Sequence, residues 1–218
     1  MELDNIKLYR MTHIENIPHI LNHGITHRNS FNANPNFITI GDLSLIDTRS
    51  TKQVNVDNGD FSNPICNTII LGDFIPFYFG VKMPMLYVVQ NGGNFVEKAT
   101  HPEDIVYLVC SLNMIVNLEI EYYFSDGHAT DKFTSFYDKS KIQELANIID
   151  WDSIKANYWG GQENLNTKRN KQAEFLVSGN LSPELIIGFG CYNDKAYQKL
   201  IDLGIENEKI KIIPKAYF

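Results

Sequence analysis

The sequence predicts an α+β fold in a single domain spanning residues 1–218. A chain of 218 residues with 44% hydrophobic composition can bury one sizeable core, so one domain is the default expectation. Strand-like and helix-like segments are mixed along the chain without the regular β–α–β rhythm that predicts a doubly wound parallel sheet. No internal repeat or low-complexity tract is evident.

An extended segment followed directly by a short helix is expected near the start of the chain. Residues 9–13 are predicted to be a strand or extended arm, and residues 14–24 a helix. Pro18 fits only the first turn of this helix, so Asn16 is the better N-cap, and Gly24 is placed to end the helix. Backbone N–H groups point outward at such a junction, which can therefore hold a phosphate.

A long ordered loop is predicted over residues 28–67, which are rich in Asn, Asp, Ser, Thr and Gly, with a short helix near residues 42–46. Loops of this length in a compact domain are usually functional. The later elements expected are strands over residues 68–71, 85–90, 105–110, 120–124, 185–192 and 210–213, and helices over residues 141–149 and 195–203. Residues 151–170 are expected to form a polar connection that leads to a strand-like stretch, residues 172–177.

The net charge of the chain counts against one class of nucleic-acid-binding protein. The formal net charge of -7 argues against a general nucleic-acid coat protein, because non-specific affinity comes mainly from basic groups that neutralise phosphates. Lys168, Arg169 and Lys171 form a local basic cluster, which indicates either a phosphate-binding groove or a solvated charged turn. The chain has no apolar run of eighteen residues, and acidic residues stand where a signal peptide would be apolar. We therefore expect a cytoplasmic protein with no membrane contact.

Several common functional motifs are absent from the sequence. GxxxxGK[ST], GxSxG and GxGxxG do not occur, which removes the usual support for phosphate-loop, serine-hydrolase and Rossmann interpretations. The cysteines are odd in number and far apart and form no CxxC motif, so we expect reduced, structural thiols at Cys66, Cys110 and Cys191. No metal site is expected.

Three residues stand out by their local setting, each with a simpler alternative. Glu174 interrupts an apolar strand-like stretch, where a carboxylate is either functional or an edge-strand residue. Tyr78 lies in an aromatic cluster that can either stack on a flat ring or fill a core. Arg49 closes the segment over residues 41–49 and is either functional or an exposed salt-bridging arginine.

These fragments, taken in order, resemble the DarT family of bacterial DNA ADP-ribosyltransferase toxins. The resemblance spans nearly the whole chain: Tyr-Arg-Met-Thr-His-Ile-Glu-Asn-Ile-Pro from residue 9, Asp-Phe-Ile-Pro-Phe-Tyr-Phe from 73, Met-Pro-Met-Leu-Tyr from 83, Phe-Ser-Asp-Gly-His from 124, Asp-Trp-Asp-Ser-Ile from 150, and Lys-Gln-Ala-Glu-Phe-Leu-Val from 171. Each fragment alone is weak evidence for the family, but several fragments in the same order and at similar spacing are specific to it.

The resemblance implies an ADP-ribosyltransferase fold, in which two packed, mainly antiparallel sheets surrounded by helices form a cleft for NAD⁺. It assigns catalysis to Glu174 and Arg49. It places NAD⁺ against the following residues: Arg10, Met11, Thr12, His13, His19, Thr26, Arg49 and Tyr78. Met85 and His128 match residues that line the active site, and residues 124–174 correspond to the target-recognising region. In this region Trp151, Tyr158 and Trp159 are candidates to stack on bases, with loop packing as the alternative, while Lys168, Arg169 and Lys171 are candidates to contact phosphates.

The function implied is transfer of ADP-ribose from NAD⁺ to a base in single-stranded DNA, with release of nicotinamide and with thymine favoured. Unstacking a base from a duplex costs a few kcal/mol, so single-stranded DNA is the simpler substrate. The alternatives are transfer to guanine, to RNA or to protein, and a non-catalytic nucleic-acid-binding module. A toxin of this kind implies a macrodomain-type antitoxin, similar to DarG, as its partner.

Overall fold

The computed structural model describes residues 3–60, 62, 67–92, 96 and 98–218. Cys110 and Cys191 are buried free thiols, as expected, whereas Cys66 lies outside the described residues. The described strands are β1 Lys7–His13, β2 Gln53–Val56, β3 Asn67–Ile70, β4 Phe74–Tyr78, β5 Ile105–Ser111, β6 Tyr122–Ser125, β7 Phe136–Tyr137, β8 Glu174–Ser178, β9 Ile186–Cys191 and β10 Ile210–Ile212. The described α-helices are α1 Ile17–His23, α2 Leu43–Thr51, α3 Pro84–Asn91, α4 Leu112–Val116, α5 Leu145–Ile148, α6 Trp151–Lys155, α7 Leu165–Asn170 and α8 Asp194–Asp202.

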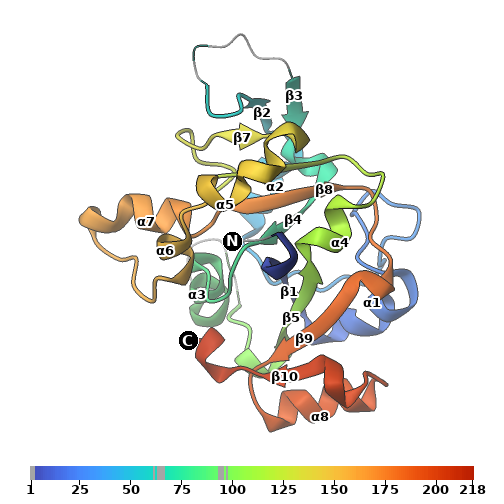
Figure 1. Cartoon of the computed structure of the whole chain (residues 1–218). Helices are drawn as coiled ribbons and strands as arrows, with labels where there is room; N and C mark the ends of the chain where they lie inside the picture. Colours follow the sequence, from blue (N-terminus) through green and yellow to red (C-terminus); the bar gives the residue numbers. More distant parts are fainter. Residues whose placement is uncertain (1–2, 61, 63–66, 93–95, 97) are drawn as a thin grey trace.

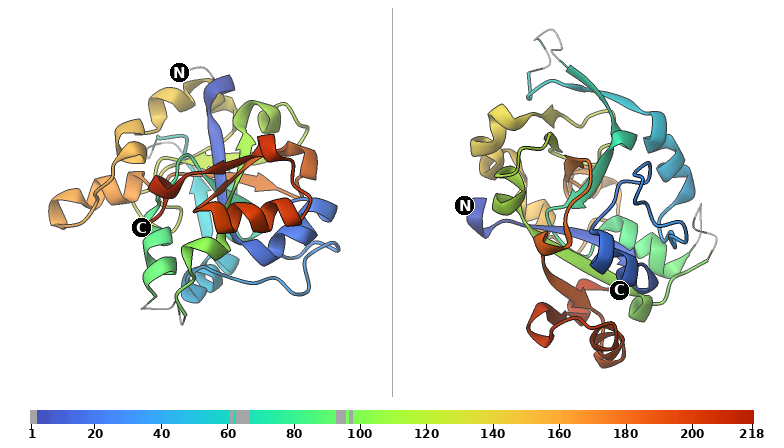
Figure 2. Two further views of the ribbon diagram at one scale, coloured as in Figure 1. Left: turned by 90° about the horizontal axis from the view of Figure 1, so that it is seen from below. Right: turned by 90° about the vertical axis from the view of Figure 1, so that its right-hand side faces the viewer.

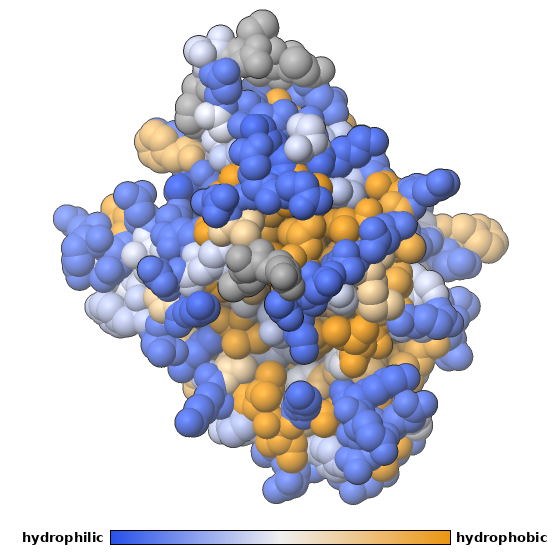
Figure 3. All heavy atoms as spheres, in the orientation of Figure 1, coloured by the Kyte–Doolittle hydropathy of each residue, from blue (hydrophilic) through white to orange (hydrophobic). Residues whose placement is uncertain are grey.

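Two sheets of unequal size organise the described residues. The larger has eight strands in the order β10-β9-β5-β1-β4-β8-β6-β7, and every neighbouring pair is antiparallel except β9 with β10. The smaller pairs β2 with β3. Figures 1 and 2 place this small sheet at one end of the molecule and α8, beside β9 and β10, at the other. The face seen in Figure 3 is largely hydrophilic, with apolar patches in its middle and lower parts.

The junction between β1 and β4 is the feature of the large sheet that matters for function. All seven residues of β1 pair with β5, whereas β1 meets β4 only where Tyr9 faces Tyr78. Beyond that pair the two strands separate, so the sheet is divided into the halves β10-β9-β5-β1 and β4-β8-β6-β7. A long side chain from either strand can enter the gap, and the guanidinium Nη1 of Arg10 crosses it to donate to the carbonyl of Pro76 at 2.9 Å.

The predicted N-terminal arm and helix are confirmed. Residues 9–13 lie in β1, a 3-10 turn over Ile14–Asn16 follows, and Pro18 occupies the first turn of α1. Asn16 holds the N-cap position, but its side chain makes no capping hydrogen bond to this helix. Gly24 ends this helix with φ +77, and a Cβ there would lie 1.9 Å from the carbonyl oxygen of Leu181. Only glycine fits such a position, because it combines a left-handed backbone with a close approach.

The predicted strand over residues 85–90 is wrong, because this segment forms α3. Pro84 occupies the first helical turn and Gly92 caps the C-terminal end with φ +70. The buried residues Leu86 and Val89 are three positions apart and therefore share one face of the helix. A short apolar run fits a buried strand and a buried helix equally well, so the flanking Pro and Gly were the informative signal.

The other elements differ mainly in length from those expected. The predicted loop over residues 28–67 contains α2, which extends to Thr51, and the strand β2. The predicted helix over residues 141–149 is a 3-10 helix, Lys139–Glu144, followed by the single-turn α5. The connection over residues 151–170 contains α6 and α7, which the sequence interpretation did not anticipate. The predicted strands over residues 68–71, 105–110, 120–124, 185–192 and 210–213 match β3, β5, β6, β9 and β10 to within a few residues.

No helix in the described part of the chain is both long enough and apolar enough to cross a bilayer.

Candidate active site

Glu174 and Arg49, 125 residues apart in the sequence, form a buried ion pair. Glu174 begins β8 and its side chain is 1% exposed, while Arg49 lies in the last turn of α2 and is 16% exposed. The Nη1 atom of Arg49 lies 3.0 Å from Oε1 and 2.9 Å from Oε2 of the carboxylate, and only the contact to Oε1 has the geometry of a hydrogen bond. The backbone N–H of Ala129 also donates to Oε1 at 3.1 Å. Glu174 is therefore a buried, positioned carboxylate and not an edge-strand residue facing solvent.

The ion pair leaves two polar atoms unused. Within the described residues, Oε2 of Glu174 and Nη2 of Arg49 are buried and have no hydrogen-bond partner. An unsatisfied buried polar atom costs about 1–3 kcal/mol, so such atoms need an explanation. A ligand with hydroxyl groups and a negatively charged or carbonyl oxygen would satisfy both atoms. The free donor on Arg49 and the free acceptor on Glu174 are thus available to bind a polar substrate.

Burial shifts the pKa values of three groups around this pair. Burial, followed by the charge of Arg49, lowers the pKa of Arg10 to about 10, which still leaves it charged near neutral pH. Burial and the charge of Glu174 raise the pKa of Tyr78, the cross-strand neighbour of Glu174. Burial lowers the pKa of His128, whose Nδ1 lies 2.8 Å from the hydroxyl of Thr130. Near neutral pH these shifts leave Arg10 charged and keep the phenol of Tyr78 and the imidazole of His128 neutral.

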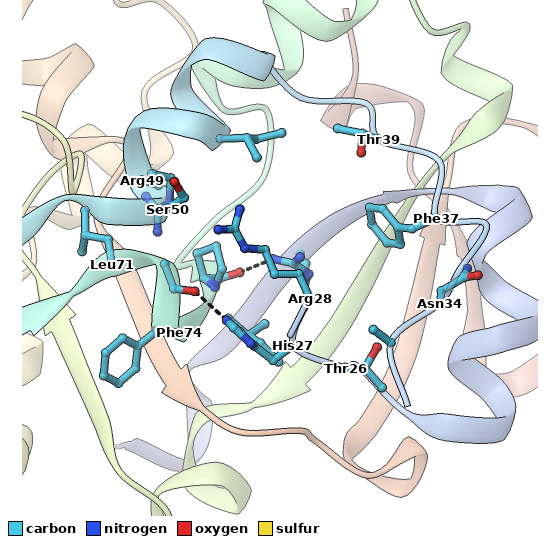
Figure 4. Close-up of a pocket in the computed structure, with 16 residues that line it drawn as sticks. Thr26, His27, Arg28, Asn34, Phe37, Thr39, Arg49, Ser50, Leu71 and Phe74 are labelled. Atoms are coloured by element: carbon cyan, nitrogen blue, oxygen red, sulfur yellow. Dashed lines mark hydrogen bonds between the residues drawn. The ribbon is translucent and has the colours of Figure 1, made fainter. Parts of the chain in front are cut away.

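A cleft with two adjoining compartments opens at this site. One compartment, of about 190 Å³, contains Glu174, Tyr78 and His128. The other, of about 290 Å³, lies between α2 and the loop that precedes it and is shown in Figure 4. The two share part of their lining: Arg10, Phe37, Thr39, Ile46, Arg49 and Pro76. Their combined shape suits an elongated ligand with one end at Glu174.

Seven of the sixteen residues that line the second compartment come from the segment directly before α2, in which only Thr26 was predicted to contact NAD⁺. Figure 4 shows Arg28 pointing into the compartment, with Phe37 and Thr39 on one side and Arg49 and Ser50 on the other. His27 is anchored at 2.6 Å to the carbonyl of Gly72. A charged residue and an aromatic one in the same polar loop were the available signal for Arg28 and Phe37, and it was missed.

Most of the residues expected to hold NAD⁺ or line the active site lie in this cleft. The structure brings the following predicted residues together there: Arg10, Met11, Thr12, Thr26, Arg49, Tyr78, Met85, His128 and Glu174. His13 and His19 do not line either compartment. The ring of His13 accepts from the N–H of Glu15 and caps the turn before α1, and the ring of His19 packs on His23 with centroids 4.5 Å apart.

The three residues of the basic cluster near Glu174 lie in different environments. Arg169 is 17% exposed and donates from Nη1 to Asp126 at 3.0 Å and to Phe133 and Thr134, so it holds the turn that carries His128. Lys168 is exposed on α7. Lys171 is buried in a third cavity that does not contain Glu174, and its ammonium lies over the ring of Trp159. Their predicted roles in DNA binding remain predictions.

No group of three or more His, Cys, Asp or Glu residues within the described ranges is arranged to hold a metal ion.

Comparisons with known proteins agree with this geometry. The family model described as "DarT: ssDNA thymidine ADP-ribosyltransferase, DarT" matches residues 9–218. A DNA ADP-ribosyl transferase of Escherichia coli O127:H6 is 29% identical over 194 residues, which are 88% of this chain and 83% of that protein. The corresponding protein of Thermus sp. strain 2.9 is 28% identical over 198 residues, 90% of this chain and 86% of its own.

Solved structures show the same fold. Thermus sp. 2.9 DarT in complex with ADP-ribosylated ssDNA superposes with a TM-score of 0.80 at 25% identity, covering 98% of this chain and 96% of that one. The same protein in complex with NAD⁺ gives a TM-score of 0.76 at 25% identity, covering 98% of both chains. The predicted ADP-ribosyltransferase fold is confirmed. The chain belongs to the DarT family of NAD-dependent ADP-ribosyltransferases that act on single-stranded DNA.

Proposed function

We propose that this chain transfers the ADP-ribose of NAD⁺ to a ring nitrogen of thymine in single-stranded DNA and releases nicotinamide. The observation that carries this proposal is the buried carboxylate of Glu174, which bonds Arg49 and Ala129 through one oxygen and keeps the other free of hydrogen bonds. A neighbour of this fold, Thermus sp. 2.9 DarT, has been solved with NAD⁺ and with ADP-ribosylated single-stranded DNA, which supports the substrate pair.

Glu174 is the proposed catalytic carboxylate. Breaking the bond between nicotinamide and ribose builds positive charge on the ribose, so a fixed negative charge nearby stabilises the transition state more than the ground state. The free Oε2 is the atom suited to accept a hydrogen bond from a ribose hydroxyl. The pairing of Oε1 with Arg49 and Ala129 keeps the carboxylate from rotating, so little reorganisation is needed when the bond breaks.

Arg49 is proposed to act on the acceptor base. A thymine ring nitrogen must lose its proton as it bonds to the ribose carbon, and that proton finally leaves to solvent. A guanidinium group is a poor proton acceptor, but its positive charge stabilises the deprotonated base. The Nη2 atom of Arg49, buried and without a partner among the described residues, is available for this contact. Arg49 thus joins the acceptor base to the carboxylate that faces the ribose.

The remaining groups of the cleft fit a dinucleotide. Arg10 lines both compartments and Arg28 lines the larger one. Their positive charges suit the pyrophosphate of a dinucleotide. Phe37 and Phe74 provide apolar surface at the lining of the larger compartment, which suits a flat base. We assign the nicotinamide end to the compartment with Glu174 and the adenosine end to the other.

The setting of the activity is also proposed. A DNA ADP-ribosyl transferase–glycohydrolase fusion protein of Thermosipho africanus is 27% identical over 213 residues, which are 97% of this chain and 49% of the fusion. A separate glycohydrolase that removes ADP-ribose, of the macrodomain type, is the antitoxin we propose as partner. We propose the cytoplasm as the location, because NAD⁺ and DNA meet there, and one domain over residues 1–218 as the unit that carries the activity.

The test is incubation of the purified chain with NAD⁺ and a panel of single-stranded oligonucleotides, followed by mass spectrometry of the DNA and of its nucleosides. We expect one ADP-ribose on thymidine, and Glu174→Gln should reduce the rate by at least about 10²-fold. Glu184→Gln, at an exposed glutamate, is the matched control and should keep full activity. An adduct on guanosine, or full activity in Glu174→Gln, contradicts the proposal.

A further inference from the structure

A third cavity, separate from the cleft, is lined by lysines. It has a volume of about 330 Å³, and five lysines line it: Lys7, Lys82, Lys155, Lys171 and Lys215. Among its described lining residues none is acidic, although the whole chain carries a formal net charge of -7. Positive charge is therefore concentrated here against the overall balance of the protein, and we call this site the lysine cavity.

The lysine cavity lies directly beside the active-site cleft. Tyr78 lines the compartment that contains Glu174, and its cross-strand partner Tyr9 lines the lysine cavity. Paired residues in adjacent strands have Cα atoms roughly 4.5–5.5 Å apart, so one residue pair separates the two sites. Figure 1 shows the elements at this side of the molecule, α3, α6, α7 and the C-terminus, next to one another. The lysine cavity is therefore within reach of a strand whose base occupies the cleft.

The ammonium groups of the lysine cavity have no carboxylate partners within the described part of the protein. None of the five lysines has a carboxylate within 4 Å there, and the only hydrogen bond donated by one of their ammonium groups runs from Lys171 to the carbonyl of Ile154 at 2.7 Å. Lys171 is 1% exposed, and burial together with the charge of Lys82 lowers its pKa to about 8. Like charges held together in this way favour a bound anion.

Aromatic rings border the same lysines. The ammonium of Lys171 lies 5.4 Å from the ring centroid of Trp159, and that of Lys82 lies 4.9 Å from the ring centroid of Phe218. Lys82 adopts a left-handed backbone with φ +57, held by a hydrogen bond from its N–H to the hydroxyl of Tyr107 at 3.0 Å. Backbone strain of this kind persists where the surrounding structure fixes a side chain in place. Positive charge beside aromatic rings is the combination that single-stranded nucleic acid recognises.

We propose that the lysine cavity binds a backbone phosphate of the DNA strand, next to the nucleotide whose base enters the cleft. This proposal rests on the proposed function, because it takes the strand from that reaction. A free phosphate group has the same local chemistry, so the experiment must separate a phosphodiester in the strand from an unattached anion.

The test uses the three exposed lysines, since Lys171 is buried and its replacement can disturb folding. The triple variant Lys7→Gln, Lys155→Gln, Lys215→Gln should raise KM for an oligonucleotide about tenfold, with kcat and KM for NAD⁺ unchanged. The logarithmic dependence of oligonucleotide affinity on salt should weaken by about 0.7 for each phosphate that the variant no longer neutralises. The matched control replaces three exposed lysines elsewhere, Lys98, Lys139 and Lys211, and should behave as wild type.

Neutral methylphosphonate linkages locate the phosphate. Placed one at a time along the oligonucleotide, one linkage near the target thymidine should raise KM in the wild type and have no effect in the triple variant. The proposal is wrong if the triple variant keeps the same linkage profile as wild type, or if about 10-fold excess inorganic phosphate over oligonucleotide abolishes binding. Fluorescence anisotropy of a labelled oligonucleotide measures binding without the reaction. If the chain binds the oligonucleotide through the lysine cavity but modifies no base, the proposed function fails while the proposal for the cavity stands.

Discussion

The side-chain amide of Asn16 bonds both backbone groups of Ile38. Nδ2 donates to the Ile38 carbonyl at 2.8 Å, and the Ile38 N–H donates to Oδ1 at 2.9 Å. Nδ2 also donates to the hydroxyl of Thr12 on β1 at 3.0 Å. A fully buried side chain therefore holds the loop that carries Phe37 and Thr39 against the strand that carries Arg10.

Replacing Asn16 with alanine should weaken NAD⁺ binding more than it weakens chemistry. Each of these hydrogen bonds stabilises the fold by about 0.5–1.5 kcal/mol, so their removal should raise KM for NAD⁺ about tenfold or more by disordering the loop. Steady-state kinetics measure this effect, with KM and kcat reported separately. Asn22→Ala, which removes an exposed amide bonded to Pro18 in the same helix, is the control. An unchanged KM in Asn16→Ala would show that the loop holds its position without this anchor.

The ion pair of Arg49 and Glu174 predicts a non-additive effect on stability. Arg49→Ala leaves a carboxylate that is 1% exposed with only Ala129 as its described partner, which should lower the free energy of unfolding by about 1–3 kcal/mol. Adding Glu174→Gln removes the unpaired charge and should recover part of that loss. Urea unfolding of the wild type, both single variants and the double variant forms the cycle that tests this. Strictly additive changes would mean that the two side chains do not stabilise each other.

The sequence predicted that Glu174 and Arg49 belong to one candidate site, whereas much of what surrounds them in the cleft could not be predicted. Glu174 alone has the pattern of an edge-strand residue, and its resemblance to a known motif was needed to pair it with Arg49. The structure then brings the two side chains together across 125 residues. The bond from Asn16 to Ile38 spans 22 residues and joins a helix start to an irregular loop, so no periodicity signals it. The sequence could only assign Asn16 as a helix cap.

Burial of polar residues was the other property that sequence patterns did not reveal. Lys171 follows two basic neighbours, which is the pattern of a solvated turn, yet packing against Trp159 and Ile154 buries it. Arg169 beside it pairs with Asp126. Which basic residue of such a cluster faces solvent depends on the packing of α6 and α7 around it, and those two helices were themselves not anticipated.

His128 predicts a loss of stability at mildly acidic pH. Burial lowers the pKa of its imidazole below the ordinary value of 6.5, while Glu174 and Asp131 oppose that shift and Arg49 and Lys52 add to it. The unfolded chain therefore takes up a proton at a higher pH than the folded one. The contribution of His128 is full above pH 6.5 and is lost as the pH falls through its lowered folded-state pKa. Urea unfolding gives the free energy of unfolding at about pH 7.5 and at about pH 5.5. The difference between these two values should be smaller in His128→Gln than in the wild type, and an equal difference would contradict the burial argument.

Gly72 should be required for the position of Arg49. A Cβ at Gly72 would lie 2.4 Å from the carbonyl oxygen of Ser50 and 2.8 Å from its Cα, and backbone atoms cannot turn aside as a side chain can. The last turn of α2 must then move, and Arg49 moves with it, away from Glu174. Gly72→Ala should therefore lower kcat at least about tenfold, while overpacking costs only about 1–3 kcal/mol of stability.

The control for this change is Gly188→Ala, in β9, where the added Cβ would lie 3.3 Å from the carbonyl oxygen of Lys209 and no cleft residue is involved. This variant can lose some stability but should keep the wild-type kcat. Thermal unfolding of both variants separates general destabilisation from displacement of Arg49. If Gly72→Ala keeps the wild-type kcat, α2 can absorb the shift without moving its arginine, and the rigid coupling between the turn at Gly72 and the ion pair does not hold.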